Sequence, residues 1–381
     1  MNVDLDRSTP IRMAMVGGGP GSFIGPVHRS AAELDGRFCL VAGAFSSAAS
    51  RSYAAGRGYG LADERSYSDW RAMLKAEKLR PDGAEAVAIV TPNHLHLPIA
   101  LAALKAGMHV VSDKPATATL AEALWLRSAV ADADRVYALT YTYTGYPMLR
   151  MARALIAAGG IGKVRKIVVE YPQGWLAEPV EAGGNKQAEW RTDPARAGKG
   201  GCIGDIGIHA FQLAEYVSGL RVTAFVADLA AVVPGRRLDD DCNLLLRFEN
   251  GARGVLIASQ IATGELNDLT LRIYGSDASV AWAHRDATTL TIRHRDGRTE
   301  IRHAAASDGH GARLPLGHPE GFIEALANIY GDVAKAIRGE NALIDTIVPG
   351  IREGVRSMLF VEKAVEASAA CAGWTSLGHN P

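Results

Sequence analysis

The order of apolar and polar positions divides the chain into two parts. Up to about residue 140, short apolar runs alternate with longer segments of helical character, the first of which is expected over residues 26–34. Continuous apolar strands that alternate with helices are typical of a parallel sheet covered by helices on both faces. We therefore predict an α/β, doubly wound Rossmann domain over residues 1–140. Its expected strands lie at residues 11–16, 38–45, 84–91, 109–115 and 136–141.

After about residue 220 the pattern changes to strand pairs joined by short turns. The pairs are separated by Asn250-Gly251, Gly275-Ser276 and Asp296-Gly297, which favour hairpins. With strand-like runs at 166–171 and 222–233, they predict an α+β domain over residues 141–381 with a large open, mostly antiparallel sheet of six or more strands. Helices at 151–159 and 319–338 are expected to cover one face. The other face should be apolar, and we predict that it forms a homo-oligomer interface, in a dimer or tetramer.

Charge and composition exclude several kinds of partner. The 41 basic and 41 acidic residues give a formal net charge of zero, so we expect no nucleic-acid binding. The first ten residues are polar and no long apolar run follows, so we expect a cytoplasmic protein that does not bind or cross a membrane. The four cysteines have no CxxC or other ligand spacing, and we expect buried free thiols and no metal.

The stretch GGGPGSFIG, residues 17–25, directly follows the first apolar run. Gly17 and Gly19 fit the dinucleotide fingerprint G-x-G-x-x-G, but the next glycines have the wrong spacing. Because the stretch follows a buried strand and opens a helix, we interpret it as a nucleotide-binding turn that bulges between Pro20 and Ile24. The residues expected to contact the cofactor here are Gly17, Gly19, Ser22, Phe23 and Ile24.

The second strand lacks the acid that normally bonds the ribose hydroxyls of NAD. It ends instead in Phe45-Ser46-Ser47, with Arg51 nearby. Serine and arginine suit the 2′-phosphate of NADP, yet serine also bonds an unmodified ribose. We expect Ser46, Ser47 and Arg51 to contact the cofactor, which we take to be NAD without excluding NADP.

Three further motifs follow in order: TPNHLHL at 91–97, SDKP at 112–115 and GGCIGDIGIHAFQL at 200–213. Together with the glycine turn, they resemble the Gfo/Idh/MocA oxidoreductases, which are NAD(P)-dependent dehydrogenases and reductases of sugars and cyclitols. The resemblance extends from Ile11 to about Arg338. The chain departs from the family pattern in the longer glycine turn and in the missing acid after the second strand. Both departures affect the grip on the cofactor rather than the chemistry.

The resemblance implies roles for particular residues. The family motif E-K-P corresponds to Asp113-Lys114-Pro115, and D-x-G-x-H to Asp205, Gly207 and His209. In the family the lysine bonds the reacting substrate oxygen, and the acid before it lies near the cofactor ribose. The TPN loop also lies near the cofactor. The resemblance thus adds Thr91, Pro92, Asn93, His96, Asp113 and Lys114 to the expected cofactor contacts.

Oxidation of a secondary alcohol requires a base within hydrogen-bond reach of the hydroxyl. We expect Asp205 to begin a helix as its N-cap residue, with His209 on the same face and kept neutral by the helix dipole. His209 is then the general base, and Asp205 orients the substrate. Lys114 holds the oxygen as negative charge develops and can relay its proton. Taken singly, such residues are more often structural, and an Asp before a helix is most often only a cap.

Four further residues are expected to contact substrate. Trp190 and Arg191 belong to the long polar loop 175–201, where they either bind the sugar or pin the loop to the core. Tyr143 follows the last Rossmann strand and serves either packing or contact. His318, in LPLGHPEG, belongs to the site of its own subunit or of a neighbour.

The favoured function is hydride transfer between NAD(P) and a secondary alcohol of a cyclitol or pyranose, such as an inositol or the C1 hydroxyl of an aldose. A neutral net charge suits an uncharged polyol. An NAD-dependent glycosidase or a 3-keto-glycoside reductase is the alternative within the family. A non-catalytic sugar- or nucleotide-sensing regulator is less favoured, because such relatives tend to lose the lysine and histidine. The motifs do not encode the substrate's hydroxyl stereochemistry.

Overall fold

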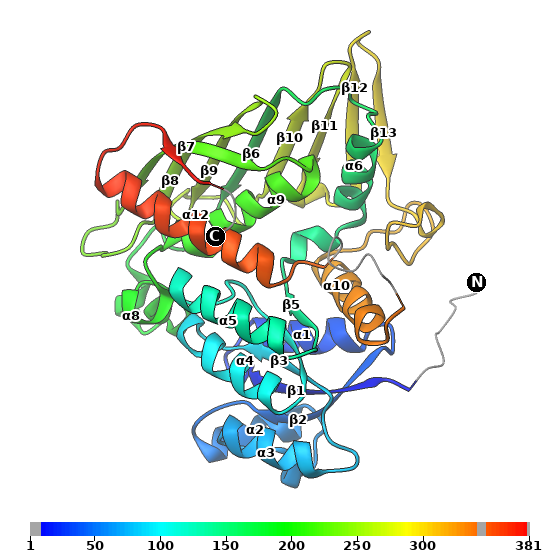
Figure 1. Cartoon of the computed structure of the whole chain (residues 1–381), viewed down its shortest axis with the longest axis vertical. Coiled ribbons are helices and arrows are strands. Elements are labelled where there is room, and N and C mark those ends of the chain that lie inside the picture. The colour runs from blue at the N-terminus through cyan, green and yellow to red at the C-terminus, as the bar shows by residue number, and fades with distance from the viewer. Residues whose placement is uncertain (1–8, 341–347, 379–381) are drawn as a thin grey trace. The chain divides into compact units, whose positions relative to one another are not determined.

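A computed structural model describes residues 9–340 and 348–378 of the 381-residue chain (Figure 1). Within these residues the chain forms two compact units. The first unit combines the segment up to Thr117 with Ala121–Thr142 and Phe322–Val355. The second unit combines Ala118–Leu120 with Tyr143–Gly321 and the segment from Arg356 onward. None of the helices in the described ranges has the length and apolar character of a membrane span.

The first unit contains a parallel sheet of five strands, in the order β2-β1-β3-β4-β5 among the described residues. The predicted strands are confirmed. Strand order reverses beside β1, and a nucleotide typically binds outside the carboxyl ends of the strands at such a point. The strands are β1 (Ile11–Gly17), β2 (Phe38–Ala44), β3 (Ala86–Val90), β4 (His109–Ser112) and β5 (Tyr137–Leu139).

Helices follow the strands as the apolar pattern predicts, although α1 begins two residues before Pro26. The helices are α1 (Ile24–Glu33), α2 (Ala49–Gly58), α3 (Trp70–Leu79), α4 (His96–Lys105), α5 (Leu120–Asp132) and α10 (Phe322–Ile337), with the 3-10 turns η1 (Asp63–Arg65), η2 (Asn93–Leu95) and η3 (Thr142–Gly145).

Helix α10 corrects one expectation. The segment 319–338 was expected to cover the antiparallel sheet, but α10 packs beside α1 against the parallel sheet. Its apolar stripe includes Leu326, Tyr330 and Val333, which join Met13 and Phe38 in one core. The spacing of the stripe predicts a buried helix face but does not specify which sheet it covers. A single boundary near residue 140 therefore does not describe this return of the chain to the first unit.

The second unit contains a sheet of nine strands among the described residues, in the order β13-β12-β11-β10-β6-β9-β8-β7-β14. Its neighbouring pairs are antiparallel except for β6 and β9. The three predicted hairpins are confirmed. The strands are β6 (Lys166–Pro172), β7 (Val222–Ala230), β8 (Asp241–Phe248), β9 (Arg253–Ser259), β10 (Thr270–Tyr274), β11 (Ala278–Ala283), β12 (Thr289–His294), β13 (Thr299–His303) and β14 (Thr375–Ser376).

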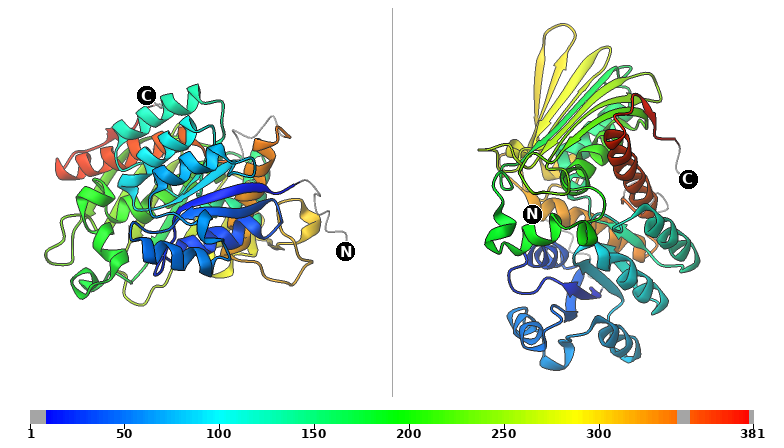
Figure 2. Two further views of the ribbon diagram at one scale, coloured as in Figure 1. Left: turned by 90° about the horizontal axis from the view of Figure 1, so that it is seen from below. Right: turned by 90° about the vertical axis from the view of Figure 1, so that its left-hand side faces the viewer.

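Helices lie on one face of this sheet (Figure 2). Phe211 of α9 stacks on Phe360 of α12, with ring centroids 4.0 Å apart. On β8, Leu244 and Leu246 are buried toward these helices, whereas Leu245 points the opposite way and is 52% exposed. The helical elements are α6 (Pro147–Ala157), α7 (Lys186–Arg191), α8 (Pro194–Ala197), α9 (Ile208–Ser218) and α12 (Ile351–Ala369), with the short turns η4 (Val180–Gly183), η5 (Ile203–Gly207), η6 (His284–Asp286) and η7 (Ala306–Asp308).

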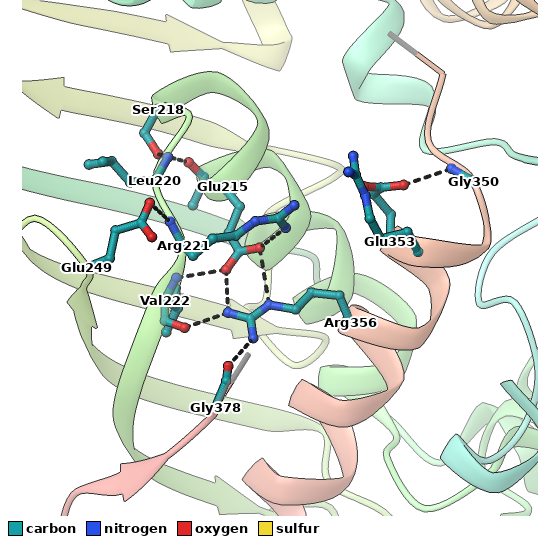
Figure 3. Close-up of polar contacts among 12 residues, drawn as sticks. Glu215, Ser218, Leu220, Arg221, Val222, Glu249, Gly350, Glu353, Arg356 and Gly378 are labelled. Atoms are coloured by element: carbon teal, nitrogen blue, oxygen red, sulfur yellow. Dashed lines mark hydrogen bonds and ion pairs between the residues drawn. The ribbon is translucent and has the colours of Figure 1, made fainter. Parts of the chain in front are cut away.

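A buried ion pair holds α12 against α9 (Figure 3). Arg356 Nη2 donates to Glu215 Oε1 at 2.8 Å, and the two side chains are only 4% and 6% exposed. The carboxylate also accepts from the Val222 backbone N–H at 2.8 Å and from Arg221 at 2.7 Å. These contacts fix the C-terminal half of α9, a helix that continues directly from η5 and carries His209 in its first turn.

Candidate functional site

The glycine turn between β1 and α1 leaves no room for side chains at three positions. A Cβ at Gly17 would lie 2.4 Å from the Val90 carbonyl oxygen, and one at Gly19 would lie 2.4 Å from that of Phe45. A Cβ at Gly25 would lie 2.3 Å from the Cα of Gly18. Gly25 therefore takes the place of the third fingerprint glycine, because it lets α1 begin beside the end of β1.

The residues between these glycines form an outward loop. Ser22 N donates to Gly19 O at 2.9 Å, and the Ser22 hydroxyl accepts from Gly25 N at 3.3 Å. Phe23 is 68% exposed, and Ile24 is the first residue of α1. The loop thus presents Ser22 and Phe23 at the helix N-terminus, where backbone N–H groups favour an anion.

The end of β2 lies against this turn. Arg51 Nη2 donates to the Pro20 carbonyl at 3.3 Å, which connects α2 to the outward loop. Ser46 accepts from Ala48 N at 3.3 Å, and Ser47 is exposed. Ser46, Ser47 and Arg51 therefore gather beside the glycines.

A buried histidine joins the ends of β3 and β4. His96 Nδ1 lies 2.7 Å from the Pro115 carbonyl oxygen, and Nε2 lies 2.8 Å from that of Thr91. Burial lowers the pKa of His96, so the ring is neutral at neutral pH and donates to one carbonyl at a time. Through Pro115 the ring braces the segment that carries Lys114.

Asp113 supports Lys114 from the other side. Its Oδ1 accepts from the Lys114 backbone N–H at 2.8 Å and from the Thr140 hydroxyl at 3.2 Å. Thr91 and Pro92 are half-buried on the adjoining loop, and Asn93 is buried. The glycine cradle, the helix N-terminus and these strand ends lie on one carboxyl edge, so the first unit fits a dinucleotide.

The D-x-G-x-H segment forms the π-helical turn η5, which continues into α9. Asp205 N donates to Gly201 O at 2.9 Å, so Asp205 lies inside the helical segment and the prediction that it is the N-cap is wrong. His209 lies more than one turn beyond the helix start near Cys202. The helix dipole acts within the first turn, and it therefore does not account for a neutral His209.

Asp239 caps this helical segment instead. Its carboxylate accepts from Gly201 N and Ile203 N, each at 2.7 Å. Asp239 also lies beside two thiols, those of Cys202 and Cys242. Among the residues that the structure describes, these three form the one cluster that could hold a metal ion, and their ligand atoms lie within 4.8 Å of one another. Burial raises the pKa of Asp239 to about 6 and that of the Cys202 thiol well above its usual range. The two backbone hydrogen bonds give Asp239 a structural role at the start of this helical segment.

One cysteine corrects an expectation from the sequence. Cys371 is exposed, so not all the thiols are buried. Asp240 is 1% exposed and accepts from Val232 N at 2.8 Å and Arg236 at 3.1 Å. Asp240 is therefore a buried acceptor that holds the segment leading into β8.

Asp205 is held by two donors to one oxygen. Arg191 Nε lies 3.2 Å from Oδ2, and Gln260 Nε2 lies 2.9 Å from the same atom. The Arg191 guanidinium lies over the Trp190 ring, 4.2 Å from the ring centroid. It also lies 6.0 Å from the centroid of the Trp175 ring. The pair Trp190-Arg191 thus contacts Asp205 directly.

His209, which is 9% exposed, packs against two tyrosines. Its ring is perpendicular to the ring of Tyr143, and the two centroids are 5.1 Å apart. The centroid of the Tyr171 ring lies 6.3 Å from that of His209. Burial raises the pKa of Tyr143 to about 12 and that of Tyr171 well above its usual range. Both phenols are therefore protonated at neutral pH.

The second unit thus brings together Tyr143, Trp190, Arg191, Asp205 and His209. His318 lies on an exposed loop, with Nδ1 3.1 Å from the Pro315 carbonyl oxygen. In the described part of the chain, none of the hydrogen bonds of His318 reaches Asp205 or His209. Sequence reasoning missed the polar partners of this cluster, which no motif marks: Tyr171, Gln173, Trp175, Gln260, Asn267 and His284.

Comparison with known proteins decides the family. Residues 11–141 match the oxidoreductase family with an NAD-binding Rossmann fold, and residues 149–281 match the GFO/IDH/MocA C-terminal domain. The chain belongs to the Gfo/Idh/MocA oxidoreductase family. It is an NAD-binding oxidoreductase, and its relatives include dehydrogenases of sugars and of inositol.

Two relatives match most of the length of this Gfo/Idh/MocA chain. An inositol dehydrogenase homologue from Azotobacter vinelandii, in complex with NAD⁺, is 36% identical with a TM-score of 0.93, over 97% of this chain and 98% of that one. The same homologue has also been solved with NADH and myo-inositol, and there the TM-score is 0.90 at 35% identity, over 97% and 98% of the two chains. Levoglucosan dehydrogenase from Pseudarthrobacter phenanthrenivorans is 29% identical over 82% of this chain and 84% of its own.

Proposed function

We propose that this protein oxidises a secondary ring hydroxyl of a cyclitol or pyranose sugar, with His209 as general base, Lys114 as the group that holds the reacting oxygen, and Asp205 as the residue that orients the substrate. The observation that carries the proposal is the D-x-G-x-H turn, which presents Asp205 and His209 from adjacent turns with separate sets of partners. The named relatives support the substrate class.

The reaction breaks one C–H and one O–H bond of the alcohol and forms a ketone or lactone. NAD, when bound, accepts the hydride. His209 takes the hydroxyl proton, and the Lys114 ammonium stabilises negative charge as it develops on the oxygen. Arg191 and Gln260 both donate to Oδ2 of Asp205, and a carboxylate has further lone pairs that accept hydrogen bonds from sugar hydroxyls.

The cofactor contacts complete the proposal. The glycine turn, with Ser22, Phe23 and Ile24, receives the pyrophosphate, and Ser46, Ser47 and Arg51 receive the adenosine ribose. Thr91, Pro92, Asn93, Asp113 and Lys114 lie on the strand ends nearer the nicotinamide. We further propose that Tyr143, Trp190 and His318 contact the sugar and that the open face of the large sheet forms a homo-oligomer.

The test is a substrate screen that follows the absorbance of the reduced cofactor. Inositol isomers, common aldoses and levoglucosan are each assayed with NAD and with NADP. On the best substrate, we expect Lys114→Ala and His209→Ala each to lower kcat/KM by a factor on the order of 100 or more. His209→Ala should still bind NADH, as measured by fluorescence titration.

The control is His303→Ala, which removes an exposed histidine at the end of β13 and should retain the wild-type rate. Full turnover by both site variants would refute the assigned mechanism. Cleavage of a glycoside without net formation of NADH would indicate the glycosidase reaction instead.

A further inference from the structure

The two tyrosines that contact His209 belong to a network of hydrogen bonds. The donor and acceptor of each bond in it can be assigned, starting from Trp175. The indole N–H can only donate, and it donates to Gln173 Oε1 at 3.0 Å. Gln173 must then present its Nε2 on the other side, where it donates to Asn267 Oδ1 at 2.6 Å. These two bonds fix the orientation of the Asn267 amide.

The oriented amide closes a ring with two tyrosines. Tyr171 donates to Asn267 Oδ1 at 2.7 Å, so its single hydroxyl proton is committed. Tyr143 must then donate to the Tyr171 oxygen, with which it makes a short hydrogen bond. Asn267 Nδ2 in turn donates to the Tyr143 oxygen at 3.3 Å. Every hydroxyl proton of the ring is used inside it.

His284 holds the backbone of the same asparagine. Its Nδ1 lies 2.8 Å from the Asn267 carbonyl oxygen, an acceptor, so Nδ1 carries the proton. Nε2 is then the acceptor for the Tyr146 hydroxyl at 2.9 Å. The loop between β9 and β10 is thereby fixed at residue 267, through both its backbone and its side chain.

From this geometry we infer that Asn267 is a positioning residue: through Tyr143 and Tyr171 it sets the orientation of the His209 imidazole for proton transfer. The inference rests on the proposed role of His209. Hydrogen bonds to both phenol oxygens keep the two rings from swinging away from the imidazole that they contact. A base must be held within narrow distance and angle limits, and small displacements of such a group cost a large part of the rate.

An amide suits this position better than a carboxylate, because it adds no charge behind the base. In the described part of the second unit, the charged and titratable groups next to the D-x-G-x-H turn are Asp205 itself, Arg191 on α7, Tyr143 on η3 and Tyr171 on β6, with His284 of η6 against Tyr143. Further along α9, the elements packed on it contribute Arg153 of α6, over the Tyr216 ring, and Arg356 of α12, paired with Glu215. A carboxylate at 267 would add a negative charge to this set and favour the imidazolium.

The experiment compares Asn267→Ala, Asn267→Asp and Tyr171→Phe with the wild type on the best substrate. We expect Asn267→Ala to lower kcat about tenfold with little change in the KM for NAD, and Tyr171→Phe to lower it less. In Asn267→Asp, the acidic limb of the kcat/KM profile should move to higher pH by roughly half a unit or more. This shift would not follow from a merely structural role.

The matched control is Tyr330→Phe, which removes a buried phenol bonded to His28 Nδ1 at 2.8 Å in the first unit. It should lower the melting temperature as much as Tyr171→Phe and leave kcat and the pH profile unchanged. Suppose that His209→Ala is inactive, as the proposed function requires. The inference is then overturned if Asn267→Ala keeps the wild-type kcat and the acidic limb of the pH profile does not move in Asn267→Asp. Activity in His209→Ala would instead remove the proposed function on which the inference rests.

Discussion

Asp239 shows how a single acidic residue gains a role that its charge alone does not suggest. Its carboxylate caps the helical segment that carries Asp205 and His209, and it lies beside two buried thiols. Burial raises its pKa to about 6, above the ordinary value of 3.8. The folded state therefore binds the proton more tightly than the unfolded state, so this group stabilises the fold at low pH and loses that contribution as pH rises through about 6.

This linkage predicts a pH-dependent difference between the wild type and Asp239→Asn. Between pH 7 and pH 5 the wild type should gain about 1 kcal/mol in unfolding free energy relative to the variant, which has no titrating group there. Urea titrations at the two pH values measure the difference. Asp308→Asn, at an exposed carboxylate, is the control and should show no such change. A pH-independent difference for Asp239→Asn would contradict the assigned protonation.

At the scale of elements, α12 and α9 are held by a charged pair as well as by aromatic packing. The Arg356 guanidinium lies in the interior with Glu215, while Phe360 stacks on Phe211. Removing one partner of a buried ion pair leaves the other charge unpaired in a medium of low dielectric. The expected cost far exceeds that of an exposed pair on the same helix.

We therefore predict that Arg356→Met lowers the unfolding free energy by about 3–5 kcal/mol, as measured by urea denaturation. Arg352→Met is the control, because Arg352 makes a 2.9 Å ion pair with Glu353 while 57% exposed. This exposed pair should contribute less than about 1 kcal/mol. Equal losses in the two variants would show that burial does not determine the strength of the Arg356 contact.

At the scale of the whole molecule, the large sheet of the second unit has one face packed by helices and one that carries exposed apolar residues such as Leu245. A broad strand surface of this kind, with polar and apolar residues mixed, is suited to self-association about a symmetry axis. The oligomer proposed above would bury this face.

The prediction for this face is that Leu245→Glu dissociates the oligomer. Light scattering after size-exclusion chromatography should give a multiple of the 40.4 kDa chain mass for the wild type and a single chain mass for the variant. Leu79→Glu, which alters a 77% exposed leucine at the end of α3, should leave the wild-type mass unchanged. An unchanged mass for Leu245→Glu would place any interface elsewhere.

The sequence by itself determined the two kinds of sheet, because strand periodicity and turn dipeptides act locally. It also determined the nucleotide turn and the order of the family motifs, since these are short stretches that need no distant partner. The tertiary structure alone decided that α10 returns to the first unit and that Gly25 serves as the third fingerprint glycine. Both depend on contacts between segments that are not adjacent in the chain.

The same division applies to the candidate site. Asp205 and His209 could be picked out because they share one motif, whereas their partners come from separate loops and strands. Gln260, Asn267 and Asp239 lie in stretches that no motif marks. Their roles follow from burial and from hydrogen-bond direction, and both of these exist only once the chain has folded.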